Sequence, residues 1–107
     1  MNETIHTLIT RRSVRKYKKA QISDEDLYLI LQAGTYAASG RGLQPCTIVV
    51  IQDTDTLARL SALNAKIMGT TNDPMYGAPT VLLVLAAIEK SPNACSDACL
   101  ILGNLMN

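Results

Sequence analysis

The chain has 107 residues, of which 48% are hydrophobic and 18% charged, and its net charge is +1. This length allows a single domain, residues 1–107, and this composition excludes a disordered chain. Trp and Phe are absent and only four Tyr are present, so the chain offers poor stacking surfaces for single-stranded nucleic acid and no nucleic-acid partner is expected.

Residues 2–10 are expected to form a short helix. Asn2 can cap it, and Ile5, Leu8 and Ile9 fall on one face at helical spacing. The segment that follows is expected to be extended.

That following segment is unusually basic. Six of the ten Lys and Arg residues lie between positions 11 and 19, with no acid among them. Val14 and Tyr17 interrupt the charges. An extended segment that buried these two side chains would direct the Arg, Ser and Arg side chains toward one point. Converging guanidinium groups and a hydroxyl suit a phosphate better than a solvated surface. A solvated basic arm and a short nucleic-acid patch remain open alternatives. The residues predicted to bind the phosphate are Arg11, Arg12, Ser13 and Arg15.

A second helix is expected from Ser23 to about Ala37. Ser23 is an N-cap residue followed by three acids, and an apolar face follows at helical spacing. Gly34 continues that face without a side chain, which would let a neighbouring element approach closely. The glycines of residues 39–42 should then break the helix into a loop whose backbone can approach another molecule.

Two apolar strands are expected, at 46–51 and 79–87, with a helix over 53–68 between them and a turn-rich loop over 69–77. Both strands are apolar enough to be buried on both faces, which requires neighbours that this chain supplies only in part. A last helix is expected to begin near Asn93 and to be apolar on nearly every side. Its apolar pattern continues as far as Asn107 without a residue that would end a helix. We therefore expect both dimerisation through apolar helices and membership of a larger domain.

The three cysteines, an odd number without a signal peptide ahead of them, favour a reduced cytoplasmic compartment. Cys95 and Cys99 are spaced i,i+4 on the last helix and are expected to be buried thiols. With His6 as the only histidine, no metal site is expected. The apolar runs are too short to span a bilayer, so no membrane partner is expected either.

Familiar catalytic patterns are missing from the sequence. No dinucleotide-binding glycine motif, phosphate-binding P-loop, nucleophilic triad or carboxylate pair is recognisable. No catalytic residue is therefore predicted, and any chemistry must come from a cofactor.

Taken together, four separate motifs resemble those of the nitroreductase family of flavoenzymes. They are Arg11-Arg12-Ser13-Val14-Arg15-Lys16-Tyr17, then Ala37-Ala38-Ser39-Gly40-Arg41-Gly42-Leu43-Gln44-Pro45, then Gly77-Ala78-Pro79 before a strand, and Asp97 followed by Asn104. The likeness covers the whole chain but only the N-terminal part of a family domain.

The resemblance implies an α+β fold, with a central sheet flanked by helices, that appears here in truncated form. It also implies FMN at the interface of a homodimer, and hydride transfer from NADH or NADPH through the flavin to a small-molecule acceptor such as a nitro compound or quinone. Carried over by position, the basic segment would hold the FMN phosphate and ribityl chain, and the other subunit would line the flavin. The lining residues would be Ala38, Ser39, Gly40, Gly42 and Gln44. The alternative is a non-catalytic module that binds flavin or another phosphorylated ligand.

Overall fold

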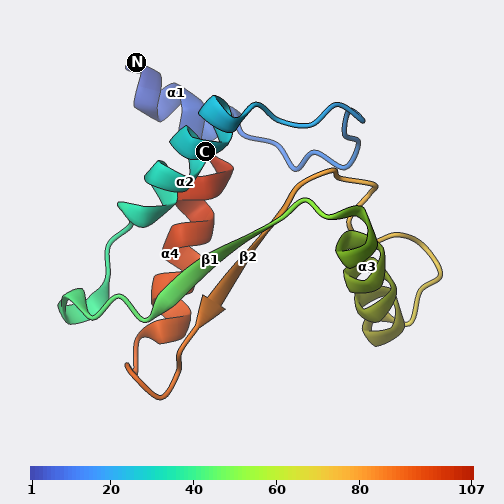
Figure 1. Cartoon of the computed structure of the whole chain (residues 1–107). Helices are drawn as coiled ribbons and strands as arrows, with labels where there is room; N and C mark the ends of the chain where they lie inside the picture. Colours follow the sequence, from blue (N-terminus) through green and yellow to red (C-terminus); the bar gives the residue numbers. More distant parts are fainter. The chain divides into compact units, whose positions relative to one another are not determined.

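Seven short elements follow one another along the chain (Figure 1). The structure is a computed structural model that describes residues 1–107. The predicted helices and strands are all present, although the second helix ends at Thr35 rather than near Ala37. In order, the elements are α1 (Glu3–Thr10), α2 (Asp24–Thr35), the 3-10 turn η1 (Gly40–Gly42), β1 (Cys46–Ile51), α3 (Thr54–Met68), β2 (Val81–Ala86) and α4 (Ala94–Met106).

Three of the helices begin at a side-chain cap. Asn2, Ser23 and Asp53 each accept a hydrogen bond from the main-chain N–H three residues further on, at 2.9, 3.1 and 2.9 Å. These bonds satisfy amide groups that the first turn of a helix leaves without a partner. Because a cap needs only neighbouring residues, the starts of α1 and α2 follow directly from the sequence.

The two strands pair in one sheet and run antiparallel. Just beyond the end of β2, the Ala87 N–H donates to the Pro45 carbonyl before the start of β1, at 2.9 Å. At the other end of the pair, the Gln52 side chain donates to the Thr80 hydroxyl at 3.0 Å. The sheet of this chain is therefore a two-stranded pair whose connection runs through α3.

Contacts divide the chain into two units. The first comprises Met1–Ser13, Ser23–Ile48 and Val84–Asn107, and the second comprises Val14–Ile22 and Val49–Leu83.

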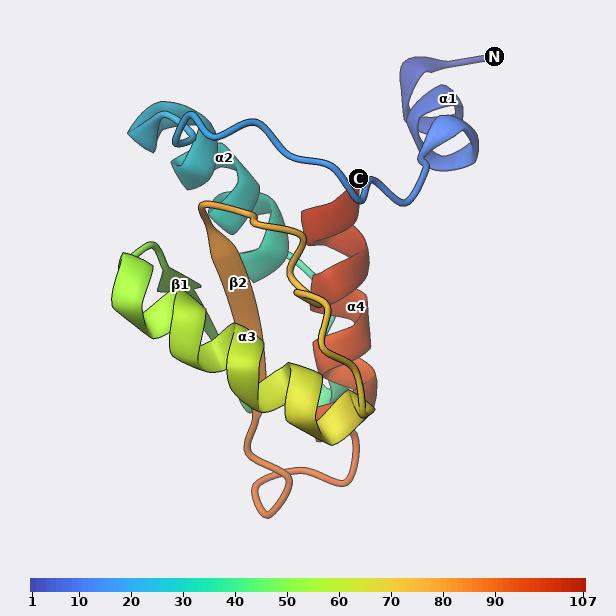
Figure 2. The ribbon, with the colours of Figure 1, turned by 90° about the vertical axis from the view of Figure 1, so that its right-hand side faces the viewer.

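In the first unit, α2 packs along α4. Gly34 is buried at this contact, and the Asn104 side chain donates to the Ala33 carbonyl at 2.9 Å. The predicted role of Gly34 as a point of close approach is confirmed, because a Cβ there would lie 2.7 Å from Leu105 Cδ2. Figures 1 and 2 both show α1 near the C-terminal end of α4.

In the second unit, the loop after α3 is closed by Asp73. Its carboxylate accepts the Ser61 hydroxyl at 2.6 Å and the N–H groups of Met75 and Gly77 at 2.8 and 2.7 Å. The bond to Ser61 holds the loop to α3, and the two main-chain bonds close the loop on itself. The Gln21 side chain donates to the Pro79 carbonyl at 3.0 Å, next to the start of β2.

Several burial predictions are wrong for this chain. The strands are only partly covered, because a two-stranded sheet has too few neighbours to bury both faces. Val14 and Tyr17 are exposed, and so are Cys95 and Cys99 on the solvent side of α4.

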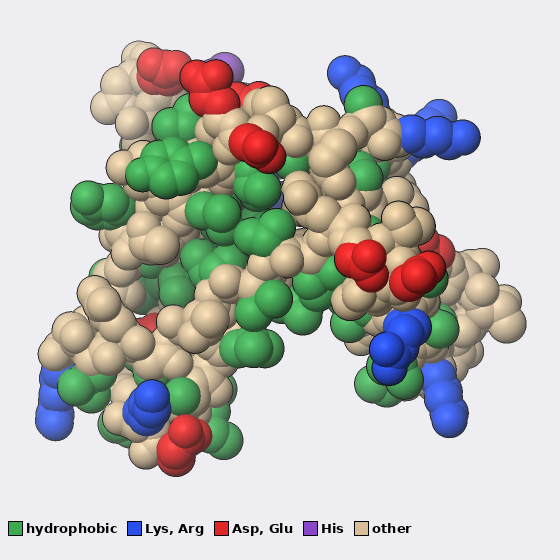
Figure 3. All heavy atoms as spheres, viewed as in Figure 1, with side chains coloured by type: hydrophobic (Ala, Val, Ile, Leu, Met, Phe, Trp, Pro, Cys, Tyr) green, Lys and Arg blue, Asp and Glu red, His purple; other side chains and the backbone are tan.

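Exposed apolar side chains are prominent on the side of the surface that carries α2 and α4 (Figure 3). On these two helices they include Tyr28, Leu29, Leu100, Leu102 and Met106. No helix is long and apolar enough to cross a bilayer.

Candidate functional site

The basic segment follows α1, is exposed, and has no regular secondary structure. The Arg11 N–H donates to the Thr7 carbonyl at 3.2 Å and ends the helix. Arg12 Nη1 donates to the Ile9 carbonyl at 3.1 Å and to the Arg11 carbonyl at 2.8 Å. Arg12 therefore places a positive charge at the negative end of α1. Arg11, Arg12 and Arg15 are all exposed, although Arg12 Nη1 is bonded to these two carbonyls.

The loop over residues 39–44 is held by α4. Ser39 Oγ donates to Asp97 Oδ2 at 2.8 Å, and the Gly40 N–H donates to Asp97 Oδ1 at 3.1 Å. Ser39 Oγ in turn accepts the Gln44 N–H at 2.9 Å. Asp97 is 3% exposed and is the only charged residue of α4. One buried carboxylate thus fixes the beginning of the loop to the first turn of α4, and Ser39 Oγ links the end of the loop to this point.

This loop has an unusual backbone. Arg41, Gly42 and Gln44 have φ values of 56°, 66° and 48°, in the left-handed region that residues other than glycine seldom adopt. Gly40 is required for a different reason: a Cβ there would lie 2.7 Å from the Asn93 side-chain nitrogen. The loop is therefore folded closely against the start of α4, and its residues Arg41 and Gly42 are exposed.

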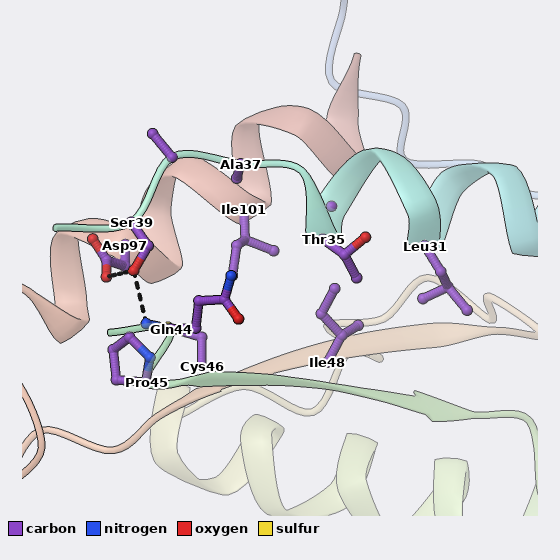
Figure 4. Close-up of a pocket in the computed structure, with 12 residues that line it drawn as sticks. Leu31, Thr35, Ala37, Ser39, Gln44, Pro45, Cys46, Ile48, Asp97 and Ile101 are labelled. Carbon is purple, nitrogen blue, oxygen red and sulfur yellow. Dashed lines mark hydrogen bonds between the residues drawn. The ribbon is translucent and has the colours of Figure 1, made fainter. Parts of the chain in front are cut away.

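Next to the loop lies an open pocket of about 330 Å³, lined by residues of α2, β1 and α4 (Figure 4). Its walls are largely apolar, and the Gln44 side chain points into it from the loop. Of the predicted site residues, Ala38, Ser39 and Gln44 line this pocket, whereas the four residues of the basic segment do not. The remaining lining residues are Leu31, Gly34, Thr35, Ala37, Pro45, Cys46, Ile48, Asp97 and Ile101.

Cys46 is the thiol in this pocket wall, and its Sγ lies 3.5 Å from the Ala94 carbonyl oxygen. Burial raises the pKa of the Cys46 thiol, and the nearby Asp97 carboxylate and Cys95 raise it further. A raised pKa keeps this thiol protonated at neutral pH, so Cys46 is poorly suited to act as a nucleophile.

Within one chain, α1 and the loop of residues 39–44 lie at opposite ends of α4. Ser39 is bonded to Asp97 near the beginning of the helix. Thr7 and Leu8 of α1, just before the basic segment, lie beside Asn107 at its far end. The ten helical residues from Asp97 to Met106 span about 15 Å. The structure therefore does not bring Arg11 and Ser39 of the same chain to one pocket.

Asp97, Asn104 and Asn93 are the residues whose roles the sequence did not reveal. The sequence places Asp97 and Asn104 in the family pattern but predicts no function for either. A single carboxylate on an otherwise apolar helix is the available signal, because such a group must find donors when the helix is buried.

The α+β arrangement and the four motifs are those expected of the nitroreductase fold. The family model described as the nitroreductase family matches residues 8–73. The chain belongs to the nitroreductase family.

Among relatives, an FMN reductase [NAD(P)H] of Bacillus subtilis is 33% identical over 98 residues, which are 91% of this chain and 37% of that protein. An NADPH-flavin oxidoreductase of Vibrio harveyi is 42% identical over 55 residues, 51% of this chain and 23% of the other. The chain thus spans well under two thirds of the length of these relatives.

Solved structures agree on the fold. A nitroreductase with bound FMN from Bacteroides fragilis has a TM-score of 0.85 at 28% identity, over 99% of this chain and 63% of that one. An FMN-dependent nitroreductase from Clostridium difficile has a TM-score of 0.85 at 34% identity, over 97% of this chain and 53% of the other. The predicted nitroreductase-like α+β fold is confirmed.

Proposed function

We propose that this chain forms part of an FMN-dependent oxidoreductase that takes a hydride from NADH or NADPH and passes it to a small-molecule acceptor. The observation that carries the proposal is the exposed, acid-free arginine segment of residues 11–15 in a chain of nitroreductase fold. The family match and the FMN named for the Bacteroides fragilis structure support the choice of cofactor.

The basic segment fits a phosphate dianion. Arg11 and Arg15 are exposed, and guanidinium forks bind phosphate oxygens in pairs. Ser13 adds a hydroxyl between them. In this proposal Arg11, Arg12, Ser13 and Arg15 hold the phosphate and ribityl chain, and Lys16, Lys18 and Lys19 are solvated charges.

The loop fits close approach to a flat ring. Its backbone is left-handed at Arg41 and Gly42, and at the exposed Gly42 no side chain stands between the main chain and a ligand. The proposed flavin-lining residues are Ala38, Ser39, Gly40, Gly42 and Gln44. Because Arg11 and Ser39 of one chain lie at opposite ends of α4, the loop would come from a second copy, and a homodimer is part of the proposal.

Bound FMN would supply the hydride chemistry, accepting from NAD(P)H and donating to the acceptor. The protein would bind the phosphate, hold the ring and exclude water, so no acid or base side chain is required. Nitro compounds and quinones are the proposed acceptors, and the cytoplasm is the proposed compartment.

The test is a flavin titration of the purified 107-residue chain. We expect bound FMN with a flavin absorption spectrum that NADH or NADPH bleaches and a nitro compound or quinone restores. Binding without bleaching would instead identify a non-catalytic flavin-binding module. A chain that stays colourless and ignores added FMN would overturn both functions.

Dimerisation is tested separately by sedimentation. We expect a dimer at micromolar concentration that persists when FMN is added. A monomer under both conditions would contradict the two-chain site.

A further inference from the structure

Both oxygens of the Asp97 carboxylate accept donors from the same loop. Oδ2 accepts the Ser39 hydroxyl and Oδ1 accepts the Gly40 N–H, at 2.8 and 3.1 Å. A buried carboxylate without donors would be strongly disfavoured, so Asp97 and the loop hold each other in place. The bond from the Gln44 N–H to Ser39 Oγ extends this hold to the far end of the loop.

These bonds leave the Ser39 hydroxyl no hydrogen for a ligand. A serine hydroxyl has one hydrogen to donate, and that of Ser39 is committed to Asp97. One of its acceptor positions is used by Gln44. Ser39 can therefore donate to a bound molecule only if the contact with Asp97 breaks, which would leave the buried carboxylate short of a partner.

The main chain of the loop has the free donors instead. The N–H groups of Gly40, Gly42, Leu43 and Gln44 are all bonded within this region. Those of Ala38, Ser39 and Arg41 have no protein acceptor. Main-chain N–H groups recognise acceptor atoms such as the ring oxygens and nitrogens of a flavin.

We propose that Asp97 is a positioning residue, which holds the loop so that the main-chain N–H groups of Ala38, Ser39 and Arg41 face the ligand. The Ser39 side chain then serves the loop rather than the ligand. This inference rests on the proposed function for the identity of the ligand, FMN, but its structural part concerns the chain alone.

The test compares Asp97→Asn with Asn104→Ala. Asp97→Asn removes the negative charge and replaces one acceptor oxygen by an NH₂ group, so both charge-assisted bonds are lost and only one of the two loop donors can keep its acceptor. Asn104→Ala removes a different tie between α4 and α2, the bond to Ala33, and leaves the loop untouched. The first measurement is amide hydrogen exchange by NMR without flavin. We expect the Gly40 and Gln44 amides to exchange about tenfold faster or more in Asp97→Asn, and at the wild-type rate in Asn104→Ala.

The second measurement is FMN titration of the same proteins. We expect Asp97→Asn to weaken FMN binding about tenfold and Asn104→Ala to leave it unchanged. Wild-type exchange rates at Gly40 and Gln44 in Asp97→Asn would overturn the inference. Failure of the wild-type chain to bind FMN would overturn the proposed function, while the exchange rates would still decide whether Asp97 holds the loop.

Ser39→Ala provides a second variant should Asp97→Asn fail to fold. It removes the hydroxyl alone and keeps the main-chain N–H. We expect faster exchange at Gln44 together with weaker FMN binding. Weaker binding with unchanged exchange at Gln44 would show the hydroxyl to be a direct ligand and would overturn the inference.

Discussion

Gly34 of α2 and Leu105 of α4 lie so close that a Cβ on Gly34 would be 2.7 Å from Leu105 Cδ2. The same Cβ would be 2.9 Å from Ile48 Cδ1 on β1. Three elements therefore meet at a residue without a side chain, beside the wall of the pocket. Alanine at this position would require both apolar side chains to move.

Gly103 offers a matched comparison, because it lies on α4 with nothing within 4 Å of its Cβ position. We expect Gly103→Ala to stabilise the chain by about 0.5–1 kcal/mol, the helix preference of alanine over glycine. Gly34→Ala should be less stable than Gly103→Ala by about 1–3 kcal/mol, the usual cost of overpacking. Urea unfolding measures both, and equal stabilisation by the two variants would contradict the close contact.

The phosphate role of the basic segment is tested by a charge-matched pair of double variants. Arg11→Ala with Arg15→Ala should weaken FMN binding, by about 1.5–3 kcal/mol for each charged contact. Lys18→Ala with Lys19→Ala removes the same charge from the same segment and should have little effect. Equal losses in both double variants, measured by fluorescence titration, would indicate a diffuse electrostatic attraction in place of a site.

The Asp73 loop predicts a dependence of stability on pH. The Ser61 hydroxyl, followed by the N–H groups of Met75 and Gly77, holds the pKa of Asp73 below its ordinary value of 3.8. A pKa lowered by folding contributes stability above the unfolded value, and this contribution is lost as the pH falls through the folded value.

Ser61→Ala removes the largest cause of this shift. We expect it to lower the melting temperature at neutral pH and to have a smaller effect well below about pH 4, where Asp73 becomes protonated. Ser96→Ala, at an exposed position of α4, is the control. A melting-temperature difference between Ser61→Ala and wild type that stays constant across the acid range would contradict the role of Asp73.

The three thiols should differ in reactivity. Cys95 and Cys99 are exposed, whereas Cys46 is half-buried with a raised pKa. Because the thiolate is the reactive form, iodoacetamide should label Cys95 and Cys99 well before Cys46 at neutral pH. Mass spectrometry of peptides follows each site. Asp97→Asn should accelerate labelling of Cys46, since it removes a negative charge that raises the thiol pKa.

Features set by neighbouring residues were predictable from the sequence. The caps at Asn2 and Ser23 and the bounds of β1 depend on a few adjacent residues, and the structure confirms them. The motif order identified the family, which the comparisons show.

Features that depend on distant residues were not predictable. The bond between Ser39 and Asp97 joins positions 58 residues apart, and no local pattern specifies it. The predicted burial of the strands was too high. An apolar sequence indicates that burial of a strand is favourable, but it does not show which elements are present to cover that strand. The roles of the proposed phosphate- and flavin-binding residues remain predictions.

Two side chains of α4, Asp97 and Asn104, form hydrogen bonds to the segment before β1, and they are seven residues apart. Each of these two connections is called a tie below. Seven residues make nearly two full turns, so both side chains leave the helix in almost the same direction. A single residue inserted between them would rotate one tie by about 100° relative to the other, and the two could no longer form together. The sequence length between these positions is therefore constrained, even though residues between them, such as Leu100 and Leu102, are exposed in the single chain.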